Sequence, residues 1–260
     1  MPTDYTLGII TVSAHDAERL ERTLNSLQKI DSRVQHITII PIEDESTANL
    51  CKQIQAKSQN NSYMGRDNNI GVYHAMNLGV EISNSEYLCF WNSGDELSSS
   101  ANLSEVVNFL VLNKPSWLVF QGEFSWREQQ ILSSKNVELF ISHKSGAFIS
   151  HQTVVVSKEL FNKIGGFDFR YLVASDTDQI SKYFKLGKPM FFDKTVVRVE
   201  KPRFASKHNR KARIEVVLIT LRNLRGKKRF MSLFNILFFE GKNKLLKLNV
   251  NLTKKTFSNE

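Results

Sequence analysis

Short apolar runs alternate with amphipathic segments through the first 200 residues of the chain. Nearly continuous apolar runs at 5–12 and 34–42 predict strands that are covered on both faces. Apolar residues at helical spacing follow each run, and they predict one helix after Asp16 and another that ends near Lys57. Asp16 is the expected cap of the first helix, with Arg19 facing solvent. This alternation predicts an α/β fold with a doubly wound, mostly parallel sheet and helices on both faces.

The stretch at 67–97 is the centre of this pattern. Gly71 begins a predicted helix, and the apolar run at 87–91 predicts a buried strand. A polar turn at 92–96 follows the strand and contains two carboxylates. Open α/β sheets bind ligands at the carboxyl ends of their strands, and acidic oxygens suit a hard cation. We therefore expect a divalent cation, Mg²⁺ or Mn²⁺, at this turn.

The segments after residue 97 predict further helices and strands around a long polar loop. Ser175 is the expected cap of the helix at 176–186. The strand at 124–132 fits either direction, and residues 133–150 are expected to form a loop over the sheet. The expected strands are 62–65, 117–122, 124–132, 151–156 and 190–199, and the expected helices are 101–113, 157–164 and 176–186.

Charge divides the chain into two predicted domains, an α/β domain at 1–200 and a basic tail at 201–260. The tail contains sixteen Lys and Arg against three Asp and Glu, whereas the whole chain has a formal net charge of +9. The first 200 residues are thus mildly acidic. Apolar spacing in the tail predicts helices at 213–224 and 229–240. The excess positive charge of the tail suggests an anionic partner. This partner could be a membrane surface, a nucleic acid or a polyanionic substrate.

The second tail helix favours the membrane among these partners. Basic residues at 227–229 precede a dense apolar and aromatic run at 230–239, as in helices that lie in an anionic bilayer interface. The run is too short to span a bilayer, which takes about 20 residues. A solvated basic face and an oligomer contact are the alternatives. We do not expect nucleic-acid binding, because the first 200 residues contain no recognisable nucleic-acid module.

The cysteines and the start of the chain indicate a reducing compartment. Cys51 and Cys89 lack metal-ligand spacing and fit a reduced, cytosolic protein. An acid precedes the first apolar run and no basic region does, so no signal peptide is predicted. We therefore expect a cytoplasmic protein, peripheral to the inner face of the cell membrane.

Four motifs connect the chain with a known family. They are IITVSAHDAERLERTLNSL, GVYHAMNLGV, FWNSGDEL and HQTVVVSKELFNKIGGFDFRYLVASDTDQI. In this order and spacing, they resemble the family 2 glycosyltransferases of the GT-A fold, in the branch that builds bacterial surface polysaccharides such as colanic acid. The resemblance covers 5–199. It implies an inverting, metal-dependent transfer of a sugar from a nucleotide-sugar donor to a hydroxyl of a glycan or lipid-linked acceptor, as in lipopolysaccharide or capsule assembly.

The resemblance also implies roles for individual residues. Asp176 corresponds to the catalytic base, and Asp95 to the carboxylate that binds the divalent cation. The other implied contacts are Thr11, Glu43, Asn69 and Asn92 with the donor, and His151 and Asp168 with the acceptor. The chemistry agrees, because a cation stabilises a leaving diphosphate and a carboxylate on the opposite face of the sugar takes the acceptor proton. A helix N-terminus favours the ionised form of Asp176.

Some positions depart from the family pattern. Asn69, His74 and Asn92 stand where relatives carry acidic residues, and 43–46 replaces an Asp-Gly-Gly-Ser type of turn. These departures leave a second hypothesis open, an inactive protein that binds nucleotide sugars without transferring them.

Asp178 is an alternative candidate for the catalytic base. Most of the residues named above also fit a purely structural role. The structural roles are a turn residue for Asp95, a solvated acidic loop for Glu43, Asp44 and Glu45, loop ordering for His151 and Asp168, and packing or capping for Tyr73, Met76 and Asn77.

Overall fold

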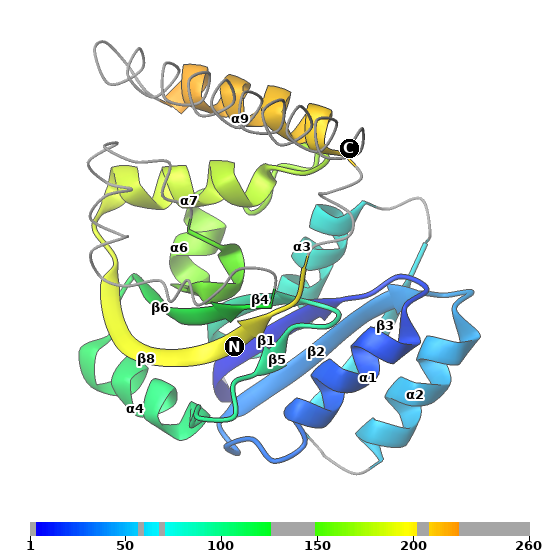
Figure 1. The fold of residues 1–260 in the computed structure, drawn as a ribbon. Helices are drawn as coiled ribbons and strands as arrows, with labels where there is room; N and C mark the ends of the chain where they lie inside the picture. The colour runs from blue at the N-terminus through cyan, green and yellow to red at the C-terminus, as the bar shows by residue number, and fades with distance from the viewer. Residues whose placement is uncertain (1–3, 57–59, 68–70, 126–148, 202–207, 224–260) are drawn as a thin grey trace, which may run out of the picture.

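The structure is a computed structural model that describes residues 4–56, 60–67, 71–125, 149–201 and 208–223. Its strands are β1 (Tyr5–Val12), β2 (Val34–Pro41), β3 (Asn61–Arg66), β4 (Ser85–Asn92), β5 (Glu96–Leu97), β6 (Trp117–Phe124), β7 (Val154–Ser157) and β8 (Met190–Val199). Its helices are α1 (Ala17–Ser26), α2 (Glu45–Gln55), α3 (Val72–Ile82), α4 (Leu103–Asn113), α6 (Lys158–Lys163), α7 (Ser175–Leu186) and α9 (Asn209–Asn223), with a 3₁₀ turn η1 (His151–Thr153). Within the described residues, the eight strands form one sheet in the order β3-β2-β1-β4-β7-β6-β8-β5 (Figure 1).

The first half of the sheet is parallel, as predicted. β1 pairs in parallel with β2 and β4, and β2 pairs in parallel with β3. The carboxyl ends of these four strands therefore meet at one edge. The second half is mixed, because β7 runs antiparallel to both β4 and β6, and β5 runs antiparallel to β8. The α/β prediction is confirmed, with a parallel portion that ends at β4.

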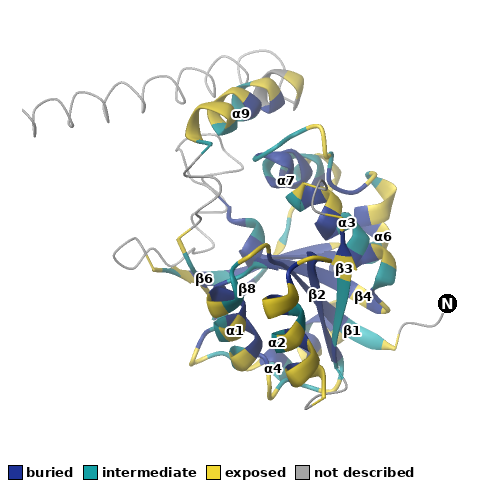
Figure 2. Cartoon of the chain, turned by 90° about the vertical axis from the view of Figure 1, so that its right-hand side faces the viewer, coloured by how far each residue is buried: buried dark blue, intermediate teal, exposed yellow. Residues whose placement is uncertain are grey.

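The apolar run at 87–91 is buried on both sides of the sheet, as predicted. Leu88 and Phe90 belong to the core beneath α3, α6 and α7. Cys89 and Trp91 belong to the opposite core, beneath α4. Side chains of a strand alternate between its faces, so a strand covered by helices on both faces has to be apolar throughout. Figure 2 shows the sheet as a buried layer between helices whose outer surfaces are exposed.

Two local predictions near the end of the domain were wrong. Residues 151–153 form η1 rather than a strand, and the strand begins only at Val154. The N-cap of α7 is Ala174, and no side chain caps this helix. Ser175 is instead the first helical residue, and it is buried. The predicted strand at 124–132 is described only to Ser125, and the predicted loop at 133–150 only from 149.

The tail begins with α9, which confirms the first predicted tail helix but starts earlier, at Asn209. This helix lies beside α7, outside the main sheet (Figures 1 and 2). The predicted helix at 229–240 lies outside the described residues. In the part of the chain that the structure describes, no helix combines the length and apolar character needed to cross a membrane.

Candidate active site

The direction of β7 brings a distant segment to the carboxyl end of β4. β4 and β7 are antiparallel, with Cys89 opposite Val155. The residues just before β7 therefore lie beside the last residues of β4. As a result η1, which contains His151 and Gln152, stands next to Asn92 and the turn that follows it.

Asn92, His151 and Asp176 form one chain of contacts at this edge. The Nδ1 atom of His151 is 2.9 Å from Oδ2 of Asp176, and its Nε2 atom is 3.5 Å from Nδ2 of Asn92. Because the carboxylate only accepts hydrogen bonds, the Nδ1 atom of His151 is the donor in its contact with Asp176. Three residues that the sequence implicated are thus brought together from β4, η1 and α7.

Tyr73 is a further member of the cluster, which the sequence analysis assigned to packing or capping. Its hydroxyl is 2.5 Å from the carbonyl oxygen of Val173 and 3.2 Å from Oδ1 of Asp176. Burial raises the pKa of Tyr73 well above its ordinary value, so the hydroxyl keeps its proton and remains a donor. The only sequence signal was its position in the GVYHAMN motif, which gave no partner.

The structure distinguishes the two candidate bases. Asp178 is 1% exposed, and its carboxylate forms an ion pair with Lys182 at 2.7 Å. Asp176 is 9% exposed and contacts His151 and Tyr73. Asp176 is therefore the candidate that stands in the cluster, whereas Asp178 is held within α7.

Asp95 ties the turn after β4 to two other segments. Its Oδ2 atom accepts hydrogen bonds from the backbone N–H of Asn92 at 2.7 Å and from the amide of Gln152 at 3.2 Å. Its Oδ1 atom accepts one from the backbone N–H of Glu200 at 2.9 Å. The side chain is 1% exposed, and this burial raises its pKa to about 6, against the opposing effect of these hydrogen bonds.

These contacts bear on the predicted cation site. A metal ligand needs an oxygen that faces the ion, but both oxygens of Asp95 already face protein donors in a buried position. Among the described residues, no group of three or more His, Cys, Asp or Glu side chains is arranged to hold a metal. As placed here, Asp95 fits an anchor of the turn better than a direct ligand. Its cation role stays a prediction, in which an ion has to reach a carboxylate that is almost fully buried.

The turn packs against α1, which explains why Arg19 is buried and not exposed as predicted. Gly94 has a φ of +96°, and a Cβ atom there would lie 2.5 Å from Nε of Arg19. The backbone N–H of Gly94 donates to the hydroxyl of Thr23 at 2.9 Å, and Arg19 donates to the carbonyl of Lys201 at 3.3 Å. A side chain at this position would adopt a strained backbone conformation and displace the guanidinium, so the turn favours glycine.

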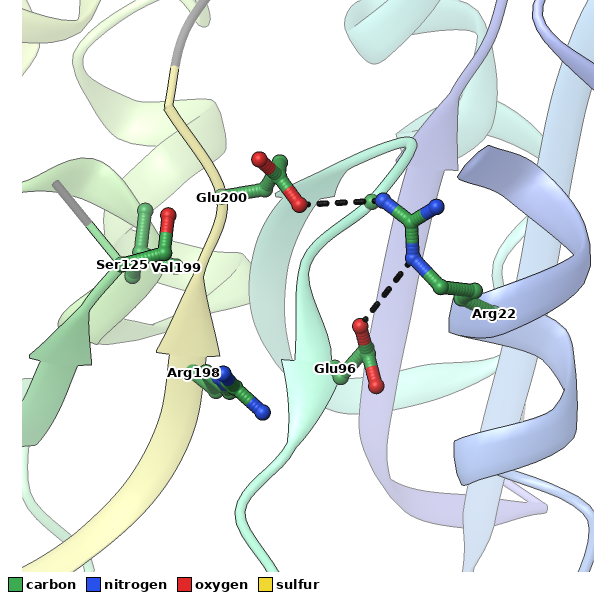
Figure 3. Close-up of a pocket in the computed structure, with 7 residues that line it drawn as sticks. Arg22, Glu96, Ser125, Arg198, Val199 and Glu200 are labelled. Carbon is green, nitrogen blue, oxygen red and sulfur yellow. Dashed lines mark hydrogen bonds and ion pairs between the residues drawn. The ribbon is translucent and has the colours of Figure 1, made fainter. Parts of the chain in front are cut away.

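A cavity of about 360 Å³ borders the same turn beside α1 and β8. Arg22 points into it and forms ion pairs with Glu200 at 2.9 Å and Glu96 at 3.4 Å (Figure 3). The positive charge of Arg22 is therefore already matched by two carboxylates. These ion pairs connect α1 with β5 and with the end of β8. The cavity is lined by Arg22, Gly94, Glu96, Ser125, Arg198, Val199 and Glu200.

The structure does not support the predicted donor contact of Thr11. The side chain of Thr11 is fully buried, and its hydroxyl lies 2.9 Å from Nε2 of His36. Burial lowers the pKa of His36 to about 4, so this histidine is neutral at pH 7. Thr11 belongs to a buried polar pair between β1 and β2 and has no surface to offer a ligand.

The other residues that the sequence analysis named either are exposed or stabilise their own helix or loop. Glu43 is exposed just after β2, at the same edge as Asn92. Asp44 is buried and caps α2, since it accepts a hydrogen bond from the N–H of Thr47. Asp168 accepts hydrogen bonds from Arg170, which lower its pKa, so it orders its own loop. Asn69 lies outside the described residues.

Comparison with known families identifies the family of the chain. Residues 8–165 match the model of Glycosyl transferase family 2, which is more than half of the chain. The chain belongs to Glycosyl transferase family 2. The matched range of this family 2 glycosyltransferase includes Asn92, Asp95 and His151, but it ends before Asp176 and the tail.

Curated relatives of the chain are named as glycosyltransferases. The chain is 30% identical over 115 residues to a PGL/p-HBAD biosynthesis glycosyltransferase of Mycobacterium bovis, which covers 44% of this chain and 43% of that protein. The match thus spans less than half the length of this relative. An uncharacterized glycosyltransferase of Mycobacterium tuberculosis is 23% identical over 205 residues, and the match covers 73% of each chain.

Solved structures share the fold of this chain. S. aureus TarS 1–349 in complex with UDP-GlcNAc has a TM-score of 0.68 at 13% identity, over 89% of this chain and 71% of that one. A mannosyltransferase of Pyrobaculum calidifontis, in complex with GDP-Man and Mn²⁺, has a TM-score of 0.65 at 12% identity, over 88% and 68%. At these identities the likeness concerns the fold alone, which is that of GT-A glycosyltransferases.

Proposed function

We propose that this chain is an inverting glycosyltransferase that moves a sugar from a nucleotide-sugar donor to a hydroxyl group of a glycan acceptor. The acceptor class we propose is a lipid-linked glycan in the assembly of a bacterial surface polysaccharide, which is the class that the four sequence motifs indicate. The observation that carries the proposal is the position of Asp176. This carboxylate reaches the strand edge of a family 2 domain and is held there by His151 and Tyr73.

In the proposed reaction Asp176 is the general base. The acceptor oxygen attacks the anomeric carbon as the bond between that carbon and the diphosphate oxygen breaks, and the acceptor proton passes to Asp176. One displacement inverts the anomeric carbon and leaves no covalent intermediate on the protein. His151 donates its Nδ1 hydrogen to Asp176 and thereby holds the carboxylate of the base in place.

The donor side of the proposal rests on the turn at 92–95 and on Glu43. Asn92 presents a half-buried amide next to His151, and Glu43 is exposed just after β2, which β1 separates from β4. The complexes of TarS with UDP-GlcNAc and of the mannosyltransferase with GDP-Man show nucleotide sugars on this fold. We therefore assign Asn92 and Glu43 to the donor, and His151 and Asp168 to the acceptor side.

A divalent cation, Mg²⁺ or Mn²⁺, is part of the proposed function as a requirement of the transfer. When bound, such an ion stabilises the negative charge of the leaving diphosphate. Asp95 is almost fully buried among protein donors, so the requirement is tested without assuming this ligand. Chelation with EDTA is expected to stop the transfer, and added Mn²⁺ to restore it.

The tail supplies the proposed location, a cytoplasmic protein on the inner face of the cell membrane. Its sixteen Lys and Arg against three Asp and Glu favour an anionic lipid surface. The full chain is expected to sediment with vesicles that contain anionic lipid, and a chain that lacks 225–260 is expected to remain in solution. Equal sedimentation of the two chains contradicts this location.

The central experiment is a donor panel of UDP-, GDP- and dTDP-sugars with Mn²⁺, read first as a thermal shift and then as sugar transfer or donor hydrolysis. Asp176→Asn is expected to keep donor binding and to lower the transfer rate about 10²- to 10⁴-fold. Glu159→Gln, an exposed acidic position on α6, is the matched control and should retain full activity. Binding without any transfer or hydrolysis by the wild type favours the inactive nucleotide-sugar-binding protein.

A further inference from the structure

A buried carboxylate of the tail reaches the segment that carries Asp176. Glu215 lies in the middle of α9 and is 5% exposed, although most of its neighbours on this helix are basic or apolar. It accepts hydrogen bonds from three consecutive backbone N–H groups. These are Leu172 at 2.8 Å, Val173 at 2.8 Å and Ala174 at 3.0 Å.

These hydrogen bonds satisfy the backbone donors at 172–174 and the buried carboxylate of Glu215 at the same time. The N-cap of α7, Ala174, offers no side-chain cap, so the backbone donors at 172–174 depend on an acceptor from elsewhere. A buried carboxylate in turn needs several donors to compensate for lost water. Its negative charge also lies close to the N-terminus of α7, where the helix dipole favours it. Both sides therefore gain from these hydrogen bonds, which hold α9 against the catalytic domain.

The same segment is connected directly to the proposed base. The backbone N–H of Val173 donates a hydrogen bond to Glu215, and the carbonyl oxygen of Val173 accepts one from the hydroxyl of Tyr73. That hydroxyl also contacts Asp176. Asp176 follows Ala174 by only two positions, so the backbone that Glu215 holds determines where the carboxylate of the base stands.

We propose that Glu215 is a positioning residue for the transfer, which holds 172–174 so that Asp176 keeps its place beside His151 and Tyr73. The role rests on the proposed function, in which Asp176 is the base. It makes the first helix of the basic tail part of the active-site support. Glu215 itself touches no reacting atom.

The test compares Glu215→Gln with Lys211→Gln in the full chain. Lys211 lies on the same helix, one turn earlier, and is exposed. The glutamine side chain keeps the size of Glu215 but turns one acceptor into an N–H₂ group that faces backbone donors. Amide hydrogen exchange at 172–174 is expected to accelerate in Glu215→Gln and to stay unchanged in Lys211→Gln. A misplaced base predicts a fall in kcat of about 10- to 100-fold, with the KM for the donor within about twofold.

The outcomes separate positioning from simple stability. Unchanged exchange at 172–174, or full kcat below the melting temperature of the variant, overturns the proposal. If Glu215→Gln does not fold, Glu215→Asp takes its place, because it keeps the charge but withdraws it by one methylene. A matching double-mutant cycle with Tyr73→Phe is expected to be non-additive in kcat, since both changes act on the same segment.

Failure of the proposed function has a different signature. In that case the wild type itself transfers and hydrolyses no donor sugar. The positioning role is then judged from the amide exchange and from the NMR signal of the Asp176 carboxyl carbon. An Asp176 signal that is the same in wild type and Glu215→Gln overturns the positioning role, and a shifted signal supports it.

Discussion

The turn at 92–95 and the segment at 172–176 are both held by a buried carboxylate, but from different distances along the chain. Asp95 lies within the turn that it holds, and one of its donors is the N–H of Asn92, three residues away. Glu215 lies about forty residues beyond the segment that it holds, on a helix of the tail. In both places a charged acceptor stabilises backbone donors that no regular structure satisfies.

The difference lies in where the carboxylate that holds each half comes from. The turn follows β4, contacts Thr23 of α1 and contains its own carboxylate, which also accepts hydrogen bonds from Gln152 and Glu200. The base segment has no brace of its own and depends on Tyr73 from α3, His151 from η1 and Glu215 from α9. We expect damage to the first half to lower stability, and damage to the second half to lower turnover.

The largest stability effect is expected from Asp95→Asn. The substitution replaces a charged acceptor with an N–H₂ group that faces a backbone donor, and it should cost about 3 kcal/mol of unfolding free energy. Chemical denaturation measures this, with Glu86→Gln, exposed near the start of β4, as the control.

The same variant distinguishes an anchor from a ligand at position 95. Donor affinity is measured with and without Mn²⁺ at a temperature where Asp95→Asn is folded. If the Mn²⁺-dependent part of the affinity disappears, Asp95 has the cation role that the sequence predicts. If it is retained, Asp95 acts only as the anchor.

Gly94→Ala is expected to cost about 2 kcal/mol of unfolding free energy. The residue has a φ of +96°, and the new methyl group would press on the guanidinium of Arg19. The matched control is Gly71→Ala, where nothing lies within 4 Å of the added Cβ atom. Equal stability of the two variants in thermal unfolding would show that the turn adjusts freely.

Tyr73→Phe tests the second half of the site, the segment at 172–176. It removes the hydroxyl that joins Val173 to Asp176, and it should cost only about 1 kcal/mol of stability while kcat falls about tenfold. Stability and turnover are measured on the same preparation. A loss of stability with unchanged kcat would place Tyr73 in packing alone.

The smallest expected effect is the pH dependence of His36. Its folded pKa of about 4 lies below the ordinary 6.5, so the unfolded chain binds the proton more readily and stability falls as the pH falls from 7. Between pH 7 and pH 5.5 the wild type should lose about 1 kcal/mol relative to His36→Gln. Parallel denaturation curves of the two proteins at both pH values provide the measurement, and an equal change in both contradicts the assignment.

The sequence by itself determined where most helices and strands lie and which acidic residues are candidates for the site. Apolar periodicity is a local signal, and it correctly predicted β1, β2, the buried strand β4 and the helix that begins after Gly71. The four motifs correctly indicated the family, and they brought Asn92, His151 and Asp176 into one hypothesis. These predictions succeeded because strand burial and helix amphipathicity are written in neighbouring residues.

Only the tertiary structure decided the partners of the polar side chains. The antiparallel direction of β7 placed His151 beside Asn92, the packing of the turn buried Arg19, and the pairing of β1 with β2 buried Thr11 against His36. The contacts that fix the site join residues far apart, such as Glu200 with Asp95 and Glu215 with Val173. Such contacts follow from the order and direction of the strands and from helix docking, which no local pattern of apolar and polar residues specifies.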